Sequence, residues 1–543
     1  MKKIFITFGL VCATFVNGWA QLNPLDLEFH RLASRRFIFS NNIPLSEFVP
    51  AEIVAFESMH PAFLPSTKGM DEAECDKNFK PVINKGQLVL SNQCGQTPVS
   101  FYVGSVNPFA TYEVDINQLT LKGDKGIKAD SVEVGFELAR LGLQDRVQLV
   151  AHRSTQKEGV YLRIYEDGKL VRQECYTDDL PDGPFKLRAQ LYGHSWGAFI
   201  EENGHTDYIG YVSVKNNFSK TIDFRRKTDA AQATFNVISN LKGCSADGGA
   251  RTYLSSGIGQ ADIRLISNED LSPYMDDNRL WFTFSCRGID IFQSAQGVLS
   301  VDPSVFDVRF EGMIMYDHGD GLLRNDYASH LFYNRQTQEW CAYACDFGGT
   351  YNRDGRSGTG LVIGTSKRDP RRGFSVMKAR KVEPTHVKHH NEDPCIFYDT
   401  DVKKWRLLTS VFKNGIVSGT FESDSWNGIF TPVADPIKMN STGTSMQRID
   451  GKVYVFMGGL GELRCHSYPD LKLKGELNLD LQPHWPKPAQ RVWASLVPLP
   501  VVYPCKYVML TMDRPNFPGS RKPNSSYGAL YLYGCHLYTS PSP

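Results

Sequence analysis

A short strand built around an aromatic residue, Leu280-Trp-Phe-Thr-Phe-Ser285, recurs four more times in the second half of this 543-residue chain. The copies are Glu339-Trp-Cys-Ala-Tyr-Ala344, Lys404-Trp-Arg-Leu-Leu-Thr409, Val453-Tyr-Val-Phe-Met457 and Lys506-Tyr-Val-Met-Leu-Thr511. Self-similarity at a spacing of roughly 50 to 65 residues is typical of repeat architectures.

Each copy occupies the same place in a larger unit. An apolar strand precedes it, a turn with Asp, Asn or Gly joins the two, and a third strand follows. The preceding strands span 263–266, 330–333, 395–398, 446–449 and 494–497. Four-stranded sheets repeated around an axis form a β-propeller. We therefore predict a five-bladed β-propeller over residues 251–543; a second large sandwich is the alternative, but it would not repeat this order.

Residues 21–250 have a different sequence pattern. Strand-like segments with alternating polarity, such as Val147–His152 and Phe185–Leu191, are separated by turn signals such as Asn203-Gly204. Long segments of helical period are missing from this region of the sequence. The pattern predicts an antiparallel β-sandwich of the jelly-roll or lectin type, so the expected fold class is all-β.

The first 20 residues have the features of a cleaved secretory signal. Lys2 and Lys3 precede an apolar stretch, and Gly18 and Ala20 form a small-x-small end. No other apolar run approaches the ~18 to 20 residues that span a bilayer. We therefore expect export to the periplasm or the extracellular space, no membrane span, and a monomer.

Charge content excludes one class of partner, and cysteine content bears on disulfide bonding. Lys and Arg (60) balance Asp and Glu (59), which argues against a chain-wide nucleic-acid footprint. The signal would remove one of 12 cysteines, leaving an odd number. Seven of the rest fall in or beside predicted blade strands, where a cysteine is usually a small buried hydrophobe. Cys75 and Cys94 are the best candidates for a disulfide.

Acidic residues stand just before the first strand of three predicted blades. The loops that enter these strands converge at one mouth of a propeller channel. The residues are Asp262, Asp326 beside Asn325, and the pair Glu392 and Asp393. Hydrolysis of a glycosidic bond needs one carboxylic acid and one carboxylate. These four acids are the predicted catalytic residues; capping of turns is the alternative interpretation for each.

Basic residues are expected around the same mouth. Guanidinium groups bind carboxylates in bidentate fashion, so the substrate could itself be an acidic sugar. Pairing with the nearby acids is the alternative. The predicted substrate-binding residues are Arg264, Arg324, His389, His390, Arg448, Arg491 and Arg514.

The run from Glu392 to Thr409, with Ser366-Lys-Arg-Asp-Pro-Arg-Arg-Gly-Phe374 before it, resembles the five-bladed propeller glycoside hydrolases of the arabinanase, xylosidase and fructosidase group. The resemblance implies that Asp262 acts as the base and that further acids come from later blades. The general-acid Glu usual in that group has no clear counterpart in blade four. A sandwich before an arginine-rich propeller looks like the hydrolase family that releases the diacid sugar 2-keto-3-deoxy-lyxo-heptulosaric acid (DHA) from the pectin rhamnogalacturonan II.

The sequence thus predicts a secreted, exo-acting glycoside hydrolase that removes a terminal acidic sugar, DHA-like or uronic, from a complex pectic glycan. No cofactor or catalytic metal is expected, with a structural Ca²⁺ as an open alternative. Two other functions stay open: a non-catalytic carbohydrate-binding protein, and a polysaccharide lyase on a propeller scaffold.

Overall fold

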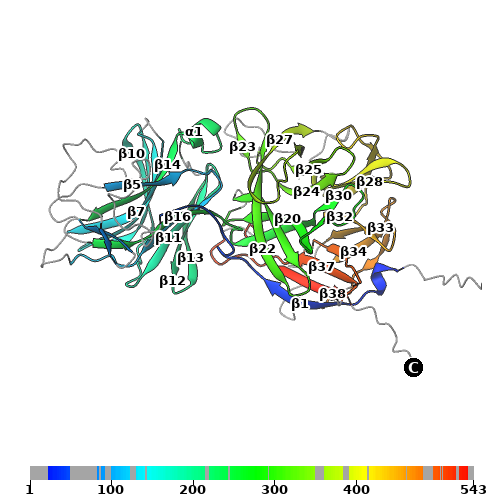
Figure 1. The fold of residues 1–543 in the computed structure, drawn as a ribbon, viewed down its shortest axis with the longest axis horizontal. Coiled ribbons are helices and arrows are strands. Elements are labelled where there is room, and N and C mark those ends of the chain that lie inside the picture. Colours follow the sequence, from blue (N-terminus) through cyan, green and yellow to red (C-terminus); the bar gives the residue numbers. More distant parts are fainter. Residues whose placement is uncertain are drawn as a thin grey trace, which may run out of the picture.

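The computed structural model describes residues 22–48, 82–84, 87–91, 99–122, 130–140, 144–213, 219, 221–241, 245–290, 293–348, 360–382, 391–412, 415–459, 462–480, 493–501, 503, 505–520 and 525–535. These residues form 38 strands, one short helix, α1 (Lys227–Ala231), and one 3-10 turn, η1 (Pro24–Asp26). The predicted all-β class is confirmed. Two bodies of sheet lie side by side along the long axis of the molecule (Figure 1).

The N-terminal body contains two six-stranded antiparallel sheets and one small sheet. The first has the order β10-β9-β8-β7-β14-β5, with β5 (Val99–Ser105), β7 (Ser131–Arg140), β8 (Arg146–Ser154), β9 (Glu158–Glu166), β10 (Lys169–Thr177) and β14 (Ala233–Leu241). The second has the order β13-β12-β11-β6-β16-β2, with β2 (Ile43–Phe48), β6 (Thr111–Ile116), β11 (Phe185–Leu191), β12 (Trp196–Glu202), β13 (His205–Val212) and β16 (Ala250–Leu254). The small sheet joins β3 (Val82–Asn84), β4 (Gln87–Ser91) and β15 (Ser245–Gly248).

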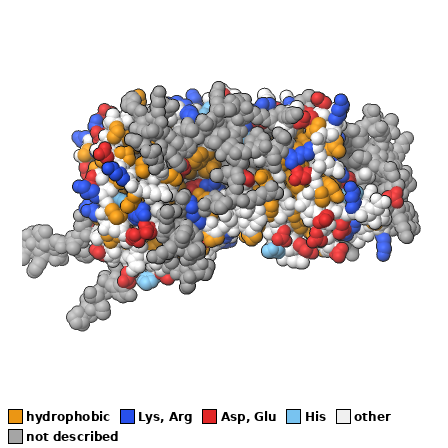
Figure 2. All heavy atoms as spheres, turned by 180° about the vertical axis from the view of Figure 1, so that it is seen from behind, with side chains coloured by type: hydrophobic (Ala, Val, Ile, Leu, Met, Phe, Trp, Pro, Cys, Tyr) orange, Lys and Arg blue, Asp and Glu red, His pale blue; other side chains and the backbone are white. Residues whose placement is uncertain are grey.

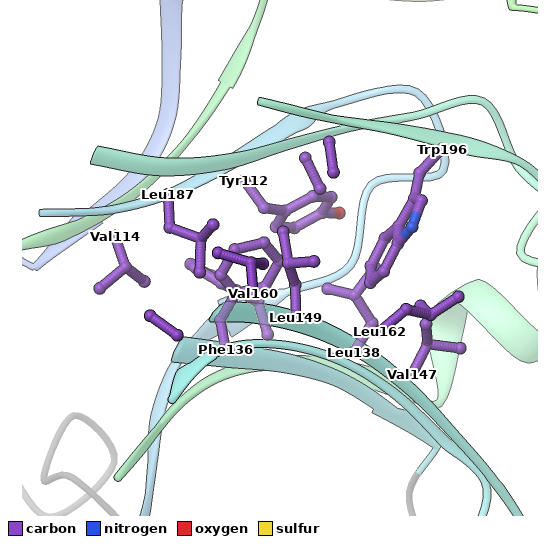
Figure 3. Close-up of a cluster of buried hydrophobic side chains, with 14 of the residues drawn as sticks. Tyr112, Val114, Phe136, Leu138, Val147, Leu149, Val160, Leu162, Leu187 and Trp196 are labelled. Atoms are coloured by element: carbon purple, nitrogen blue, oxygen red, sulfur yellow. The ribbon is translucent and has the colours of Figure 1, made fainter. Parts of the chain in front are cut away.

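One hydrophobic core lies between the two six-stranded sheets. Alternate residues of each strand point inward, as a half-buried sheet requires. Tyr112, Phe136 and Trp196 fill the middle of this layer, surrounded by leucines and valines of both sheets (Figure 3). The rings of Phe136 and Trp196 meet edge to face, with centroids 6.2 Å apart.

The second body consists of consecutive groups of four antiparallel strands, a propeller-like arrangement. The first group is β17 (Gly259–Leu265), β20 (Arg279–Arg287), β21 (Ser294–Asp302) and β22 (Asp307–Asp317). The second is β24 (Tyr327–Asn334), β25 (Glu339–Cys345), β26 (Leu361–Ser366) and β27 (Gly373–Val382). The third is β28 (Asn391–Asp399), β29 (Lys404–Phe412), β30 (Ile416–Ser423) and β31 (Thr431–Pro432). The fourth is β32 (Thr442–Ile449), β33 (Lys452–Gly458), β34 (Leu463–Ser467) and β35 (Leu473–Glu476).

The last group recruits a strand from the start of the chain. It contains β36 (Ser495–Pro498), β37 (Tyr507–Met512) and β38 (Leu530–Cys535), and β1 (Phe29–Arg35) pairs antiparallel with β38. An uncovered β38 would present an open sheet edge, and β1 satisfies its hydrogen bonds. The predicted sandwich boundaries of 21–250 therefore do not hold for the segment that contains β1.

Short strands supplement the first two groups. They are β18 (Ser267–Asn268), β19 (Met275–Asp276) and β23 (Leu323–Arg324). Parallel pairing of β22 with β27 joins the first two groups into one continuous sheet.

The two bodies meet through an apolar cluster and several hydrogen bonds. Phe39, Phe199 and Phe517 belong to this cluster, so each body contributes side chains to it. Arg36, on the segment after β1, donates to the carbonyl oxygens of Ile258 at 2.8 Å and of Pro515 at 3.0 Å. Arg36 thereby fixes this segment to the second body and to the link that precedes β17.

The cysteines of the described residues lie where the sequence predicts, and the surface carries charges of both signs. All seven cysteines expected in blade strands are free and buried there: Cys286, Cys341, Cys345, Cys395, Cys465, Cys505 and Cys535. Cys75, Cys94 and the predicted signal of residues 1–20 lie outside the described residues. Acidic and basic side chains both occur over the face in Figure 2. No helix among the described residues is long and apolar enough to cross a bilayer.

Candidate active site

The inner strands of the first four groups begin with the same irregularity. In β17, β24, β28 and β32 the pairing register shifts within the first six residues. One residue at each shift has a left-handed backbone: Asp262 (φ 55°), Ala328 (φ 56°), Asp393 (φ 56°) and Gly443 (φ 64°). Such β-bulges re-aim a side chain at the end of a strand. Two of the four equivalent positions therefore present a carboxylate.

Asp262 is a buried carboxylate bound by a cation. Its Oδ2 accepts hydrogen bonds from Ser285 Oγ at 2.6 Å and from Arg287 Nη2 at 2.8 Å. Its side chain is only 6% exposed, as is that of Arg287. A charge-assisted hydrogen bond of this length stabilises an ionised carboxylate.

Asp393 is a buried carboxylate in a different electrostatic state. Its Oδ2 accepts from Thr442 Oγ1 at 2.7 Å and from the Gly443 backbone N–H at 2.9 Å. Burial, together with the negative charges of Glu392 and Asp262, raises the pKa of Asp393 to about 7. Asp393 can therefore carry a proton near neutral pH, beside the Arg287-bound Asp262.

Aromatic rings and guanidinium groups surround Asp262. The Arg287 guanidinium lies 5.1 Å from the ring centroid of Tyr327 and 5.0 Å from that of Tyr527. Arg514 lies 5.1 Å from the same Tyr527 ring. Burial and the charge of Asp262 raise the pKa of Tyr527, against the opposing effect of Arg287 and Arg514. Sequence reasoning missed Arg287, Tyr327 and Tyr527. Arg287 ends β20 and Tyr527 precedes β38, so neither belongs to an inner strand. Tyr327 begins the inner strand β24, but it is neither acidic nor basic, and the sequence pattern was used to find acids and cations.

Arg264 holds the inner strands together. Its Nη1 donates to the Thr444 carbonyl at 2.5 Å and its Nη2 to the Asp393 carbonyl at 3.4 Å. It comes two residues after the Asp262 bulge, and its side chain is buried. The guanidinium is thus engaged with backbone oxygens of the third and fourth groups, so we assign it a positioning role.

Asp326 does not stand at the bulge of its own inner strand. It precedes the β24 bulge by two residues, so the structural equivalent of Asp262 in this group is Ala328. Asp326 accepts from the Gly348 N–H at 2.8 Å and lies 3.3 Å from His318. Asp326 is therefore not the backbone equivalent of Asp262, and its place at the channel mouth stays a prediction.

The other predicted residues are distributed as follows. Glu392 is half-buried beside Asp393. Arg324, on the short strand β23 beside β22 of the first group, forms a salt bridge with Asp320 at 2.6 Å. Arg448 donates to the Gly451 carbonyl and stands five residues beyond Gly443, about 17 Å along an extended strand. Arg448 therefore lies at the end of β32 that is away from the Gly443 bulge. His389, His390 and Arg491 lie outside the described residues.

Comparisons with known proteins give likenesses of overall shape. No protein-family model matches the sequence, and neither does any curated protein. The chain is similar to the catalytic domain of Coprinopsis cinerea GH62 α-L-arabinofuranosidase (12% identity, TM-score 0.34, 51% of this chain, 90% of that chain). It is also similar to the GH43_1 enzyme of Xanthomonas citri complexed with xylose (11%, 0.35, 52% and 88%). Penicillium chrysogenum α-L-arabinanase complexed with arabinobiose is a third (9%, 0.31, 65% and 91%). At these TM-scores the argument for function comes from the site itself.

Proposed function

We propose that the protein is a glycoside hydrolase built from an N-terminal β-sandwich and a five-bladed β-propeller, with Asp262 and Asp393 as its catalytic pair. One observation carries the proposal. Two equivalent bulges present two buried carboxylates, one bound to Arg287 and the other with a pKa of about 7. Paired carboxyls with separated proton affinities are the requirement of glycosidic hydrolysis.

The two carboxyls take different roles in this proposal. Protonated Asp393 donates its proton to the leaving glycosidic oxygen, and its position is fixed by Thr442 and the Gly443 N–H. Ionised Asp262 either activates a water or attacks the anomeric carbon. Glu392 contributes its charge, which helps to keep a proton on Asp393. The equivalent bulge of the fourth group has Gly443, which carries no carboxyl. Asp393 is therefore the residue that we assign as the general acid.

The substrate that we propose is a terminal acidic sugar, DHA-like or uronic, of a pectic polysaccharide. Arg287 and Arg514, both near the Tyr527 ring, place positive charge beside the carboxylate pair. Guanidinium groups suit a sugar carboxylate. A polysaccharide substrate also agrees with export of the protein, which the predicted secretory signal implies.

The test is release of monosaccharides from rhamnogalacturonan II and other acidic glycans, read by mass spectrometry. Wild-type protein should release one acidic sugar, and Asp262→Asn should release at least about 100-fold less, the usual effect of removing acid–base catalysis. Asp399→Asn, which alters a buried carboxylate at the far end of β28, is the matched control. Binding of the glycans without release would refute the proposal and favour a carbohydrate-binding protein.

A further inference from the structure

The backbone N–H of each acidic bulge residue donates to a sulfur atom of a neighbouring group. The Asp393 N–H donates to Cys345 Sγ at 3.2 Å, and the Asp262 N–H donates to Met512 Sδ at 3.1 Å. Cys345 is the last residue of β25 and Met512 is the last residue of β37, and both side chains are buried. Each acidic bulge is therefore held by the second strand of the group beside it.

The sulfur occurs where the next bulge carries a carboxylate. On the second strand of each group, the equivalent position is the residue that pairs with the residue before the bulge. In the first four groups these residues are Ser285, Cys345, Ser410 and Gly458. Only Cys345 among them has a sulfur atom, and the bulge of the group that follows it has Asp393; the bulges of the second and fourth groups have Ala328 and Gly443. The last group supplies Met512 to the first.

A left-handed bulge residue needs such an acceptor for its N–H. The φ angles of Asp262 and Asp393 are 55° and 56°, where a residue with a Cβ is strained, and strained backbone persists only where its surroundings hold it. A buried N–H without an acceptor also destabilises the conformation that buries it. Loss of the sulfur should therefore favour relaxation of the bulge, and the bulge is what directs the carboxyl.

The thiol of Cys345 links the bulges of three successive groups. It donates to the Ala328 carbonyl at 3.9 Å and accepts from the Asp393 N–H. The carboxyl of Asp393 accepts in turn from the Gly443 N–H at 2.9 Å. Burial and the negative charges of Asp393 and Glu392 hold the pKa of the thiol well above its usual range, so its sulfur adds no charge beside the carboxylates.

We propose that Cys345 and Met512 are positioning residues for the carboxylate pair: each sulfur accepts the backbone N–H of one acid and thereby fixes the direction of its carboxyl. The effect on turnover rests on the proposed function, whereas the hydrogen bonds can be tested without substrate. Neither sulfur contacts the substrate in this assignment. Loss of either one should therefore lower kcat and leave KM nearly unchanged.

Residue-resolved hydrogen–deuterium exchange of the full-length protein tests the bonds directly. Cys345→Ala should speed exchange of the Asp393 amide by about tenfold or more, because the N–H loses its acceptor. Cys345→Ser should keep that exchange within about threefold of wild type, because a hydroxyl can accept from Asp393 and donate to Ala328. Cys341→Ala removes another buried thiol of β25; it is the matched control and should leave the Asp393 amide at the wild-type rate.

Monosaccharide release on the same samples should change in parallel. Cys345→Ala should lower kcat by about tenfold or more, because the acid is misplaced. It should also move the decline of the pH–rate profile from about 7 toward lower pH, because a loosened Asp393 is better hydrated. Cys345→Ser should restore both. Met512→Leu, which keeps the side-chain volume, should lower kcat as well, whereas Met509→Leu on the same strand should not.

Several results would overturn the assignment. Wild-type exchange of the Asp393 amide in Cys345→Ala would refute it, with or without a known substrate. Wild-type kcat and pH–rate profile in Cys345→Ala, beside an inactive Asp393→Asn, would refute it too. If Cys345→Ala fails to fold, exchange of the Asp262 amide in Met512→Leu decides the question. Full activity of Asp393→Asn would instead refute the proposed function and leave the exchange result unaffected.

Discussion

Replacing Asp393 by asparagine should stabilise the protein and inactivate it together. The amide keeps an oxygen that can accept from Thr442 and the Gly443 N–H, but it removes a buried negative charge. The pKa of Asp393 rises from 3.8 to about 7 on folding. A shift of that size corresponds to about 4 kcal/mol of unfavourable free energy once the carboxyl ionises.

The sign of the pH dependence follows from this shift. The folded protein holds the proton more tightly than the unfolded chain, so its stability falls as pH rises from about 4 to 7 and is lowest above 7. Asp393→Asn should therefore raise the melting temperature clearly at pH 8. At pH 4 the difference should be small, because the folded carboxyl is then protonated and the unfolded one, with its pKa of 3.8, is only partly ionised.

The assay is thermal unfolding at pH 4 and pH 8, with monosaccharide release measured on the same samples. Activity should fall by about 100-fold or more. Asp399→Asn is the control on the same strand: Asp399 accepts from Tyr468, so its substitution should bring no stability gain at pH 8. A melting temperature for Asp393→Asn that is lower than wild type at pH 8 would refute the electrostatic reasoning.

Three further predictions follow from the same site. Arg287→Met should lower the free energy of unfolding by about 3 to 5 kcal/mol and reduce turnover, because it leaves Asp262 buried without its cation. The control is Arg309→Met, which removes an exposed ion pair and should change the free energy of unfolding by under about 1 kcal/mol in the same thermal unfolding experiment. Ala328→Gly should raise the free energy of unfolding by about 1 kcal/mol, because alanine is strained at a φ of 56°, and a lower melting temperature would contradict the bulge. In a pH–rate profile, kcat/KM should decline as pH rises through about 7, where Asp393 loses its proton; a profile that rises through pH 7 would exclude Asp393 as the acid.

Much of the strand pattern could be predicted from the sequence, because local alternation encodes it. The aromatic segments starting at Leu280, Glu339 and Lys404 fall inside β20, β25 and β29. The same is true of the segments starting at Val147 and Phe185, which fall inside β8 and β11. Apolar residues at every second position mark a half-buried strand without reference to the rest of the chain.

The pairing of β1 with β38 could not be predicted in this way. Phe29 pairs with Cys535, and nothing near either residue encodes a partner about 500 residues away. Long-range register depends on which sheet edge remains open after the other strands have formed. The domain boundaries predicted from local sequence pattern therefore placed β1 in the N-terminal body, whereas it pairs with β38 in the second body.

The residues of the proposed site could be selected from the sequence only in part, for a related reason. Asp262 and Asp393 stand just before the apolar segments 263–266 and 395–398 that the sequence predicts, so their position in the repeat selected them as candidates. Asp326 stands before a strand too, but the bulge places Ala328, two residues later, at the equivalent position. Arg287 and Tyr527 come from β20 and from the loop before β38, so no inner-strand pattern could reveal them.

The most direct test of the central claim is hydrolysis of an acidic pectic glycan in ¹⁸O-labelled water. A glycoside hydrolase should release an acidic sugar carrying one ¹⁸O at its anomeric carbon, in wild type and Asp399→Asn but not in Asp262→Asn or Asp393→Asn. Release of an unsaturated, ultraviolet-absorbing sugar without the label would show a lyase. Either that result or full labelling by both Asp262→Asn and Asp393→Asn would contradict the proposed function.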